Sequence, residues 1–285
     1  MPVSRRDRDA YRENGVILLK GFFAKGEIEA VHADARHVFG LQMVERGILR
    51  TEDVSDEEFE SGMFELFARD VAAIANCGKQ AQHLISLHRL SLDSRILEAL
   101  RAFGLYFPII STRPVLYFNS PRLATKEVYW RVPLHQDWRS MQGSLDSVFV
   151  WIPLVDIDRA LGALEIIPGS HRRGLLPAGA ADSSFAEVQK TETDVGSLTP
   201  VEVEKGDALF CSTFLLHQSG TNATRTVRWS CHFRYNNLHE RTFIERGFPH
   251  PYVYAPRADL ITPGFPGAEA VAAVFAKSDP DEDAR

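Results

Sequence analysis

Two fragments of the sequence, far apart along the chain, restrict the folds that are open to it. His135 and Asp137 are separated by one residue, and His217 follows 82 residues after His135. Alternate residues of a strand point to the same side, so His135 is expected to face the same way as Asp137, and His217 the same way as Ser219. Only a fold that brings distant strands together unites the two fragments. A jelly roll does so, because its strands return across the barrel.

The first part of the chain, about residues 1–104, is expected to be mainly helical. Residues 4–7 and 55–58 have the Ser-x-x-Asp/Glu pattern of a capping box, which opens a helix. Asn14-Gly15 is expected to end the first helix, ahead of a short apolar strand over residues 16–19. Apolar residues at helical spacing predict two further buried helix faces: Ile28, Val31, Ala35, Val38 and Phe39 on one, and Ile96, Leu97, Leu100 and Phe103 on the other.

From about residue 105 to 240 the sequence favours short antiparallel strands separated by Pro, Gly and Asn. Residues 148–155 are continuously apolar, as in a strand covered on both sides. In residues 226–235 apolar and polar side chains alternate, and Arg228, Ser230, His232 and Arg234 share the polar face. Such a face is commonly exposed to solvent, but in a small barrel it can line an internal site.

The fold expected from these patterns is mainly β with packed helices. Its core is a double-stranded β-helix of the jelly-roll or cupin-like kind, with a helical N-terminal segment. The whole chain, residues 1–285, is expected to form one domain, with helical support over about 1–104, the core over about 105–240, and a C-terminal arm with an acidic tail over 241–285. The aromatic and proline-rich stretch 243–266 fits either a substrate-side flap or an irregular packing arm, and the packing arm is slightly favoured.

Composition excludes several classes of protein. An apolar fraction of 45% and a charged fraction of 25% are typical of a soluble globular protein. The net charge of −6 and the lack of a basic run make a nucleic-acid partner unexpected. The first ten residues have no apolar stretch behind them, so neither a signal peptide nor a membrane span is expected. Cys77, Cys211 and Cys231 have no CxxC spacing, which favours a reduced, cytoplasmic setting and three core cysteines.

The residue types of the two fragments point to metal chemistry. Two histidines and one carboxylate are the set that holds ferrous iron on one face and leaves positions open. Arg228 follows His217 by eleven residues and offers a permanently charged fork for a dicarboxylate. Alone, an HxD pair arises often by chance, and a single histidine or arginine is more often an ordinary partly buried or paired side chain. The agreement of ligand types, strand alternation and an inward-facing arginine favours the metal site.

The sequence resembles the phytanoyl-CoA dioxygenase family of iron(II)/2-oxoglutarate-dependent oxygenases from about residue 10 to about residue 240. The resemblance rests on these stretches: His135-Gln136-Asp137, Val150-Trp151-Ile152-Pro153-Leu154, Gly162-Ala163-Leu164-Glu165, Pro168-Gly169-Ser170-His171, Gly206-Asp207-Ala208, His217-Gln218-Ser219-Gly220 and Arg228. The stretches around Asn14-Gly15-Val16 and Gly21-Phe22 are also similar to the family's opening.

The resemblance implies a role for each matching residue. It makes His135, Asp137 and His217 the ligands of Fe(II), and Arg228 the partner of the distal carboxylate of 2-oxoglutarate. Ser219 and Trp151 match positions that assist the contact between Arg228 and 2-oxoglutarate or line the co-substrate pocket. Tyr117 and Asn119 lie where further contacts to the co-substrate or substrate arise. His171 is interpreted as structural. Trp138, His232 and Arg234 either face the substrate or serve packing and ion pairs.

The implied activity is the hydroxylation of an unactivated C–H bond of a small-molecule metabolite with O2, releasing succinate and CO2. Relatives that halogenate have a small residue at the position of Asp137, so the carboxylate favours hydroxylation, with desaturation and ring formation still open. Two alternatives remain: a metal-dependent cupin-type enzyme that does not use 2-oxoglutarate, and a non-catalytic ligand-binding module. The sequence identifies neither the substrate nor the oligomeric state.

Overall fold

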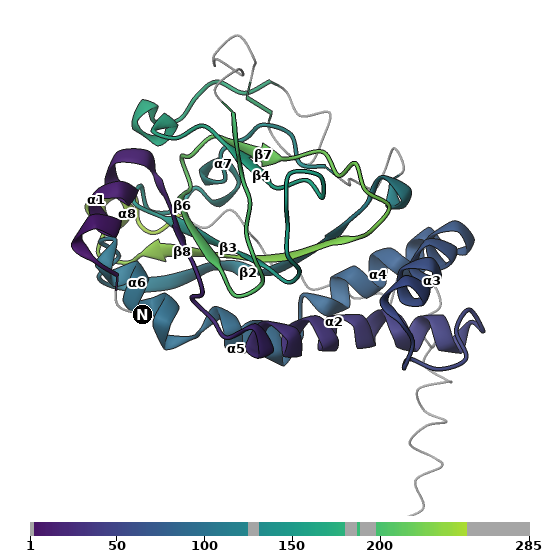
Figure 1. Ribbon diagram of the computed structural model, residues 1–285. Coiled ribbons are helices and arrows are strands. Elements are labelled where there is room, and N and C mark those ends of the chain that lie inside the picture. The colour runs from purple at the N-terminus through teal and green to yellow at the C-terminus, as the bar shows by residue number, and fades with distance from the viewer. Residues whose placement is uncertain (1–2, 125–130, 180–186, 189–197, 250–285) are drawn as a thin grey trace, which may run out of the picture. The chain divides into compact units, whose positions relative to one another are not determined.

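Helices in the N-terminal part of the chain begin and end largely where the sequence predicted. The computed structural model describes residues 3–124, 131–179, 187–188 and 198–249, all within one unit, Met1–Pro251 (Figure 1). Ser4 caps α1 (Arg5–Asn14) with a complete capping box, and Gly15, at φ 72°, ends it in the left-handed region that glycine adopts readily. A second capping box at Ser55 opens α3 (Asp56–Arg69).

Further helices complete this part of the chain. The predicted apolar faces lie on α2 (Lys25–Glu45) and α6 (Ser94–Ala102), whereas α4 (Val71–Ala81) and α5 (Ile85–Ser91) had not been singled out. Short helical segments occur later in the chain: η1 (Pro121–Leu123), α7 (Trp138–Met141), η2 (Ser170–Arg173) and α8 (Arg241–Glu245).

The strands form two antiparallel sheets, which confirms the jelly-roll core. The larger sheet has the order β1-β6-β3-β8-β2, built from β1 (Val16–Leu19), β2 (Pro108–Asn119), β3 (Val148–Pro153), β6 (Ala208–Ser212) and β8 (Arg228–Asn237). The smaller has the order β5-β4-β7, built from β4 (Leu164–Ile166), β5 (Thr199–Val201) and β7 (His217–Ser219). An isolated bridge between His135 and His217 places the predicted HxD segment beside β7.

β3 is buried on both faces of the larger sheet, which explains its continuous apolar run. Val148, Val150 and Ile152 belong to the same core cluster as apolar residues of the N-terminal helices. Phe149 and Trp151 belong to a second cluster with Leu164 and Ile166 of the smaller sheet. Successive β3 residues therefore pack alternately against the helices and against the opposing sheet.

The polar face of β8 lies inside the protein rather than in solvent. Every residue of β8 is buried. Its apolar side chains join the helix-facing cluster, where Trp229 packs edge-on against Phe39 with ring centroids 5.4 Å apart. On its polar face, Arg228, His232 and Arg234 line a cavity between the sheets. Of the two explanations that the sequence left open, the internal site is the right one.

Other expectations concern the cysteines and the ends of the chain. Cys77, Cys211 and Cys231 are buried free thiols, as predicted. No helix in the part of the chain that the structure describes is long and apolar enough to cross a membrane. The acidic tail and residues 250–266 of the stretch considered as a flap lie outside the described residues.

Candidate active site

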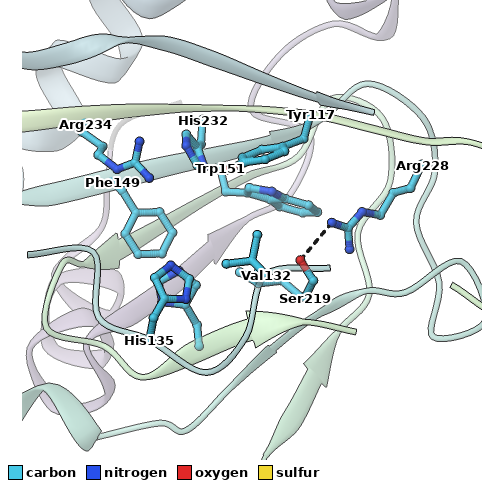
Figure 2. A pocket seen from close by; sticks show the side chains of 11 residues that line it. Tyr117, Val132, His135, Phe149, Trp151, Ser219, Arg228, His232 and Arg234 are labelled. Carbon is cyan, nitrogen blue, oxygen red and sulfur yellow. Dashed lines mark hydrogen bonds between the residues drawn. The ribbon is translucent and has the colours of Figure 1, made fainter. Parts of the chain in front are cut away.

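A cavity lies between the two sheets and contains most of the residues that the sequence selected. Its cavity volume is about 30 Å³, within a wider hollow of about 420 Å³ that includes open solvent. Its walls come from β2, β3, β4, β7, β8 and the segment before α7 (Figure 2). The lining residues are Tyr117, Val132, His135, Phe149, Trp151, Leu164, His217, Ser219, Arg228, His232 and Arg234.

Three of the described residues could together hold a metal ion, and two of them, His135 and His217, line this cavity. One ligand atom from each of His135, Asp137 and His217 lies within 4.8 Å of the others, and all three residues are buried. His135 and His217 are held together by two backbone hydrogen bonds, with N–O distances of 3.0 and 3.2 Å. The sequence argument assumed that Asp137 continues a strand, but its backbone is helical, at φ −62° and ψ −31°. It stands directly before α7, and its side chain makes no capping hydrogen bond to that helix.

Both histidines present the same ring nitrogen to the centre of this group. Nδ1 of His135 lies 2.8 Å from the carbonyl oxygen of Pro133, and Nδ1 of His217 lies 3.0 Å from that of Leu215. A carbonyl oxygen only accepts, so Nδ1 carries the proton in each neutral ring and Nε2 keeps its lone pair. Burial, together with the neighbouring His135, lowers the pKa of His217 to about 3, so this imidazole is neutral at physiological pH.

Asp137 is paired with Arg234 through both of its carboxylate oxygens. Nε of Arg234 donates to Oδ2 at 2.9 Å, and one terminal nitrogen donates to Oδ1 at 3.0 Å. Burial alone would raise the pKa of Asp137, but the charge of Arg234 holds it well below its usual range. The site thus offers one anionic oxygen and two neutral nitrogens, a donor set that suits Fe(II).

Gln136, between the two candidate ligands of the HxD motif, fixes the segment that carries them. Its side-chain nitrogen donates to the carbonyl oxygens of Gly174 at 2.8 Å and Phe214 at 2.7 Å, and its side-chain oxygen accepts from the backbone N–H of Leu176 at 2.8 Å. The side chain is buried, so these bonds tie the motif to two neighbouring loops. Sequence reasoning missed this role, which depends on tertiary contacts alone.

Arg228 is a buried cation whose partners are neutral. Its guanidinium donates to the carbonyl oxygen of Gly162 and, at 3.2 Å, to the hydroxyl of Ser219. Among the residues that the structure describes, its Nε has no hydrogen-bond partner and no carboxylate pairs with it. Burial lowers the pKa of Arg228 to about 10, so the side chain remains charged at neutral pH. Figure 2 shows it on one side of the cavity, with His135 and Arg234 on the other.

The remaining candidates fall into two groups. Tyr117 and Trp151 line the cavity, as does His232, whose ring lies against Tyr117 with centroids 5.2 Å apart. Asn119 is buried beside Arg228 in the β2–β8 pairing but is not part of the cavity lining. Trp138 stacks on Phe214 and donates to the carbonyl oxygen of Ser144, so it serves packing.

His171 and the Gly206-Asp207-Ala208 motif have structural roles away from the cavity. Nε2 of His171 lies 3.2 Å from the carbonyl oxygen of Arg12, which links η2 to α1. The carboxylate of Asp207 accepts from the backbone N–H groups of Gly21 at 2.8 Å and Glu204 at 3.0 Å.

Comparisons with known proteins agree with this geometry. The model of the phytanoyl-CoA dioxygenase family matches residues 11–230. Peroxisomal phytanoyl-CoA dioxygenase of Bos taurus is 26% identical over 247 residues, which cover 83% of this chain and 70% of that protein. Ectoine dioxygenase of Bordetella parapertussis is 22% identical over 80% of this chain and 74% of its own length.

Solved structures show the same fold. The epimerase SnoN, in complex with Fe3+, alpha ketoglutarate and nogalamycin RO, aligns with a TM-score of 0.53 at 18% identity, covering 81% of this chain and 82% of that one. The matched family model spans both fragments of the candidate metal site and Arg228. The chain therefore belongs to the phytanoyl-CoA dioxygenase family and is an iron- and 2-oxoglutarate-dependent dioxygenase.

Proposed function

We propose that this dioxygenase hydroxylates a C–H bond of a small-molecule metabolite, with His135, Asp137 and His217 holding Fe(II) and Arg228 holding 2-oxoglutarate. The observation that supports the proposal most directly is the buried charge of Arg228, whose hydrogen-bond partners among the described residues are neutral. A buried cation is costly unless an anion pairs with it. The distal carboxylate of 2-oxoglutarate supplies that anion and can accept from the fork at two points.

The residues around the site divide the remaining tasks. When bound, Fe(II) and 2-oxoglutarate supply the oxidation, in which O2 is consumed and succinate and CO2 are released. The imidazoles of His135 and His217 and the carboxylate of Asp137 would hold the metal. Ser219 orients the guanidinium of Arg228 through its hydroxyl. Trp151 and Phe149 wall the cavity with apolar surface and exclude water from it.

The proposed substrate is a small molecule and not specifically an acyl-CoA. The relatives' names include phytanoyl-CoA, ectoine and methylphosphonate, which share no common handle. The net charge of −6 gives no general attraction for phosphorylated compounds. A reduced, cytoplasmic setting is proposed because the three cysteines are buried free thiols.

The proposal is tested by titrating the purified protein with Fe(II) and then 2-oxoglutarate without oxygen. Chelation of 2-oxoglutarate to Fe(II) gives a weak visible charge-transfer band, which is expected to saturate at one equivalent. His135→Ala is expected to lose the band by losing iron, and Arg228→Met by losing 2-oxoglutarate. Arg12→Met, an exposed arginine of α1, is the matched control and should keep it.

Each result bears on the choice of function. A band that disappears in both site variants justifies screening acyl thioesters, amino-acid derivatives and terpenoids for succinate release. Folded wild-type protein that binds Fe(II) but shows no band would favour a metal-dependent enzyme that does not use 2-oxoglutarate. Folded protein that binds neither would favour a non-catalytic module.

A further inference from the structure

Arg234 is the charged residue of the cavity to which the proposed chemistry assigns no task. It lies in β8, between neighbouring strands on both sides: Phe149 of β3 is its register partner on one, and Thr112 of β2 on the other. Its side chain is 9% exposed and its carboxylate partner, Asp137, 2%. A side chain on a central strand is held more firmly than one on a loop.

The contact between Arg234 and Asp137 uses two nitrogens and two oxygens. Each carboxylate oxygen has two lone pairs, and the guanidinium takes one on each. Oδ1 is also the oxygen that faces the metal-binding nitrogen, because it lies 3.3 Å from Nε2 of His135. The guanidinium therefore leaves one lone pair on each oxygen. Of the two oxygens, Oδ1 is the one placed beside the histidines to bind a metal ion with that lone pair.

We propose that Arg234 is a positioning residue that restricts Asp137 to metal ligation through one oxygen, Oδ1. The inference rests on the proposed function of His135, Asp137 and His217 as iron ligands. One-oxygen ligation matters because a second Asp137 oxygen on the metal would occupy a coordination position that 2-oxoglutarate or O2 needs. Arg234 thereby keeps three positions open.

The shape of the side chain, and not only its charge, carries this role. A guanidinium is a planar fork whose donors match both carboxylate oxygens, whereas a lysine ammonium is a point charge that fixes neither. Asp137 needs such support because its backbone belongs to the start of a short helix and not to a sheet. Losing an outer-shell partner of a metal ligand typically lowers metal affinity by about 10- to 100-fold.

The test measures metal binding alone, without 2-oxoglutarate and without catalytic turnover. Co(II) is titrated into wild type, Arg234→Lys, Arg234→Gln and Arg234→Ala, and its affinity and visible absorption are recorded, because the intensity of that absorption reports coordination number. Arg246→Lys, an arginine whose guanidinium contacts the backbone oxygens of Gln142 and Gly143 instead, is the matched control. Circular dichroism establishes that each variant is folded.

We expect the folded Arg234 variants to bind Co(II) about 10- to 100-fold more weakly and with an altered spectrum, lysine included. Millimolar guanidinium should restore the wild-type spectrum to Arg234→Ala, whereas ammonium should not. If Arg234→Ala does not fold, the test uses Arg234→Lys and Arg234→Gln.

Wild-type affinity and spectrum in the folded Arg234 variants would overturn the inference. Rescue by ammonium as well as guanidinium would reduce the role to charge alone and also overturn it. Wild-type protein that binds no Co(II) would instead overturn the proposed metal site, and this inference with it.

Discussion

The imidazole rings of His135 and His217 lie with their centroids 4.2 Å apart, and the same two residues exchange both backbone hydrogen bonds across an antiparallel bridge. The bridge attaches the HxD segment to the edge of the smaller sheet. The two side chains that share a proposed ligand role are therefore held together by main-chain bonds that do not depend on those side chains.

Replacing His217 by Ala is expected to abolish metal binding while leaving the fold intact, because the backbone bridge remains. Metal affinity should fall by more than the roughly 10- to 100-fold that an outer-shell partner is worth. The measurement is thermal unfolding with and without Fe(II): wild type should gain stability from the metal, and His217→Ala should not. His83→Ala, an exposed histidine, is the control. An undiminished shift in His217→Ala would place the metal elsewhere.

Gln136→Leu is expected to destabilise the protein strongly although the side-chain volume changes little. Two buried backbone groups, the carbonyl of Phe214 and the N–H of Leu176, and the partly buried carbonyl of Gly174 would lose their partner. Each such orphan costs about 1–3 kcal/mol, so a loss of about 3 kcal/mol or more is expected in urea unfolding. Gln80→Leu, on the exposed face of α4, should change stability by no more than about 0.5 kcal/mol. Equal losses of stability in the two variants would contradict the proposed role of the Gln136 hydrogen bonds.

Gly220→Ala is expected to weaken 2-oxoglutarate binding more than metal binding. A Cβ at Gly220 would collide with the backbone oxygen of Ala163 and crowd Gly162, whose own carbonyl accepts from Arg228. The strain should also lower stability by about 1–3 kcal/mol. Calorimetric titration with each ligand separates the two affinities. Gly26→Ala, with open space around its Cβ, should bind both ligands as wild type does. A Gly220 variant that loses both affinities equally would argue against a local effect on Arg228.

His32 is expected to make stability depend on pH in the weakly acidic range. Burial lowers the pKa of this imidazole to about 4, against an ordinary value of 6.5, and its ring lies 5.3 Å from that of Trp229. Between these values the unfolded chain binds a proton that the folded protein does not. Stability from His32 is therefore complete above pH 6.5 and is lost as pH falls toward 4, at up to about 1.4 kcal/mol per pH unit.

The check is urea unfolding of wild type and His32→Gln across pH 4 to 7. The variant should show a flatter dependence of unfolding free energy on pH below 6.5, whereas the exposed control His83→Gln should follow wild type. If the unfolding free energies of His32→Gln and wild type depend on pH in the same way, His32 is not the cause of the pH dependence.

Local signals made much of the fold predictable. The helices that begin after Ser4 and Ser55 are predictable because a capping box is completed within four residues of sequence. By contrast, α4 was not singled out, because small residues form much of its buried face and give weak periodicity: Ala73, Cys77, Gly78 and Ala81. Position 78 requires glycine because the ring of Phe118, from the distant strand β2, packs where a Cβ would lie.

The site was predictable in its residue types but not in its geometry. The spacing of His135 and Asp137 suggested one strand face, whereas Asp137 has a helical backbone and reaches the group through the turn into α7. Its pairing with Arg234, 97 residues later, is formed only when β8 lies beside the HxD segment. Alternation in residues 226–235 showed that two faces exist, but not which face meets solvent, because that depends on the second sheet.

Because apolar and polar residues alternate along β8, protein engineering could treat this one strand as two separate sets of positions. Substitutions at Trp229, Cys231 and Phe233 would change the packing against the helices, whereas Ser230 and His232 lie on the opposite face of the strand. A library that varies only the second set would explore altered chemistry on a scaffold whose helix-facing core is unchanged.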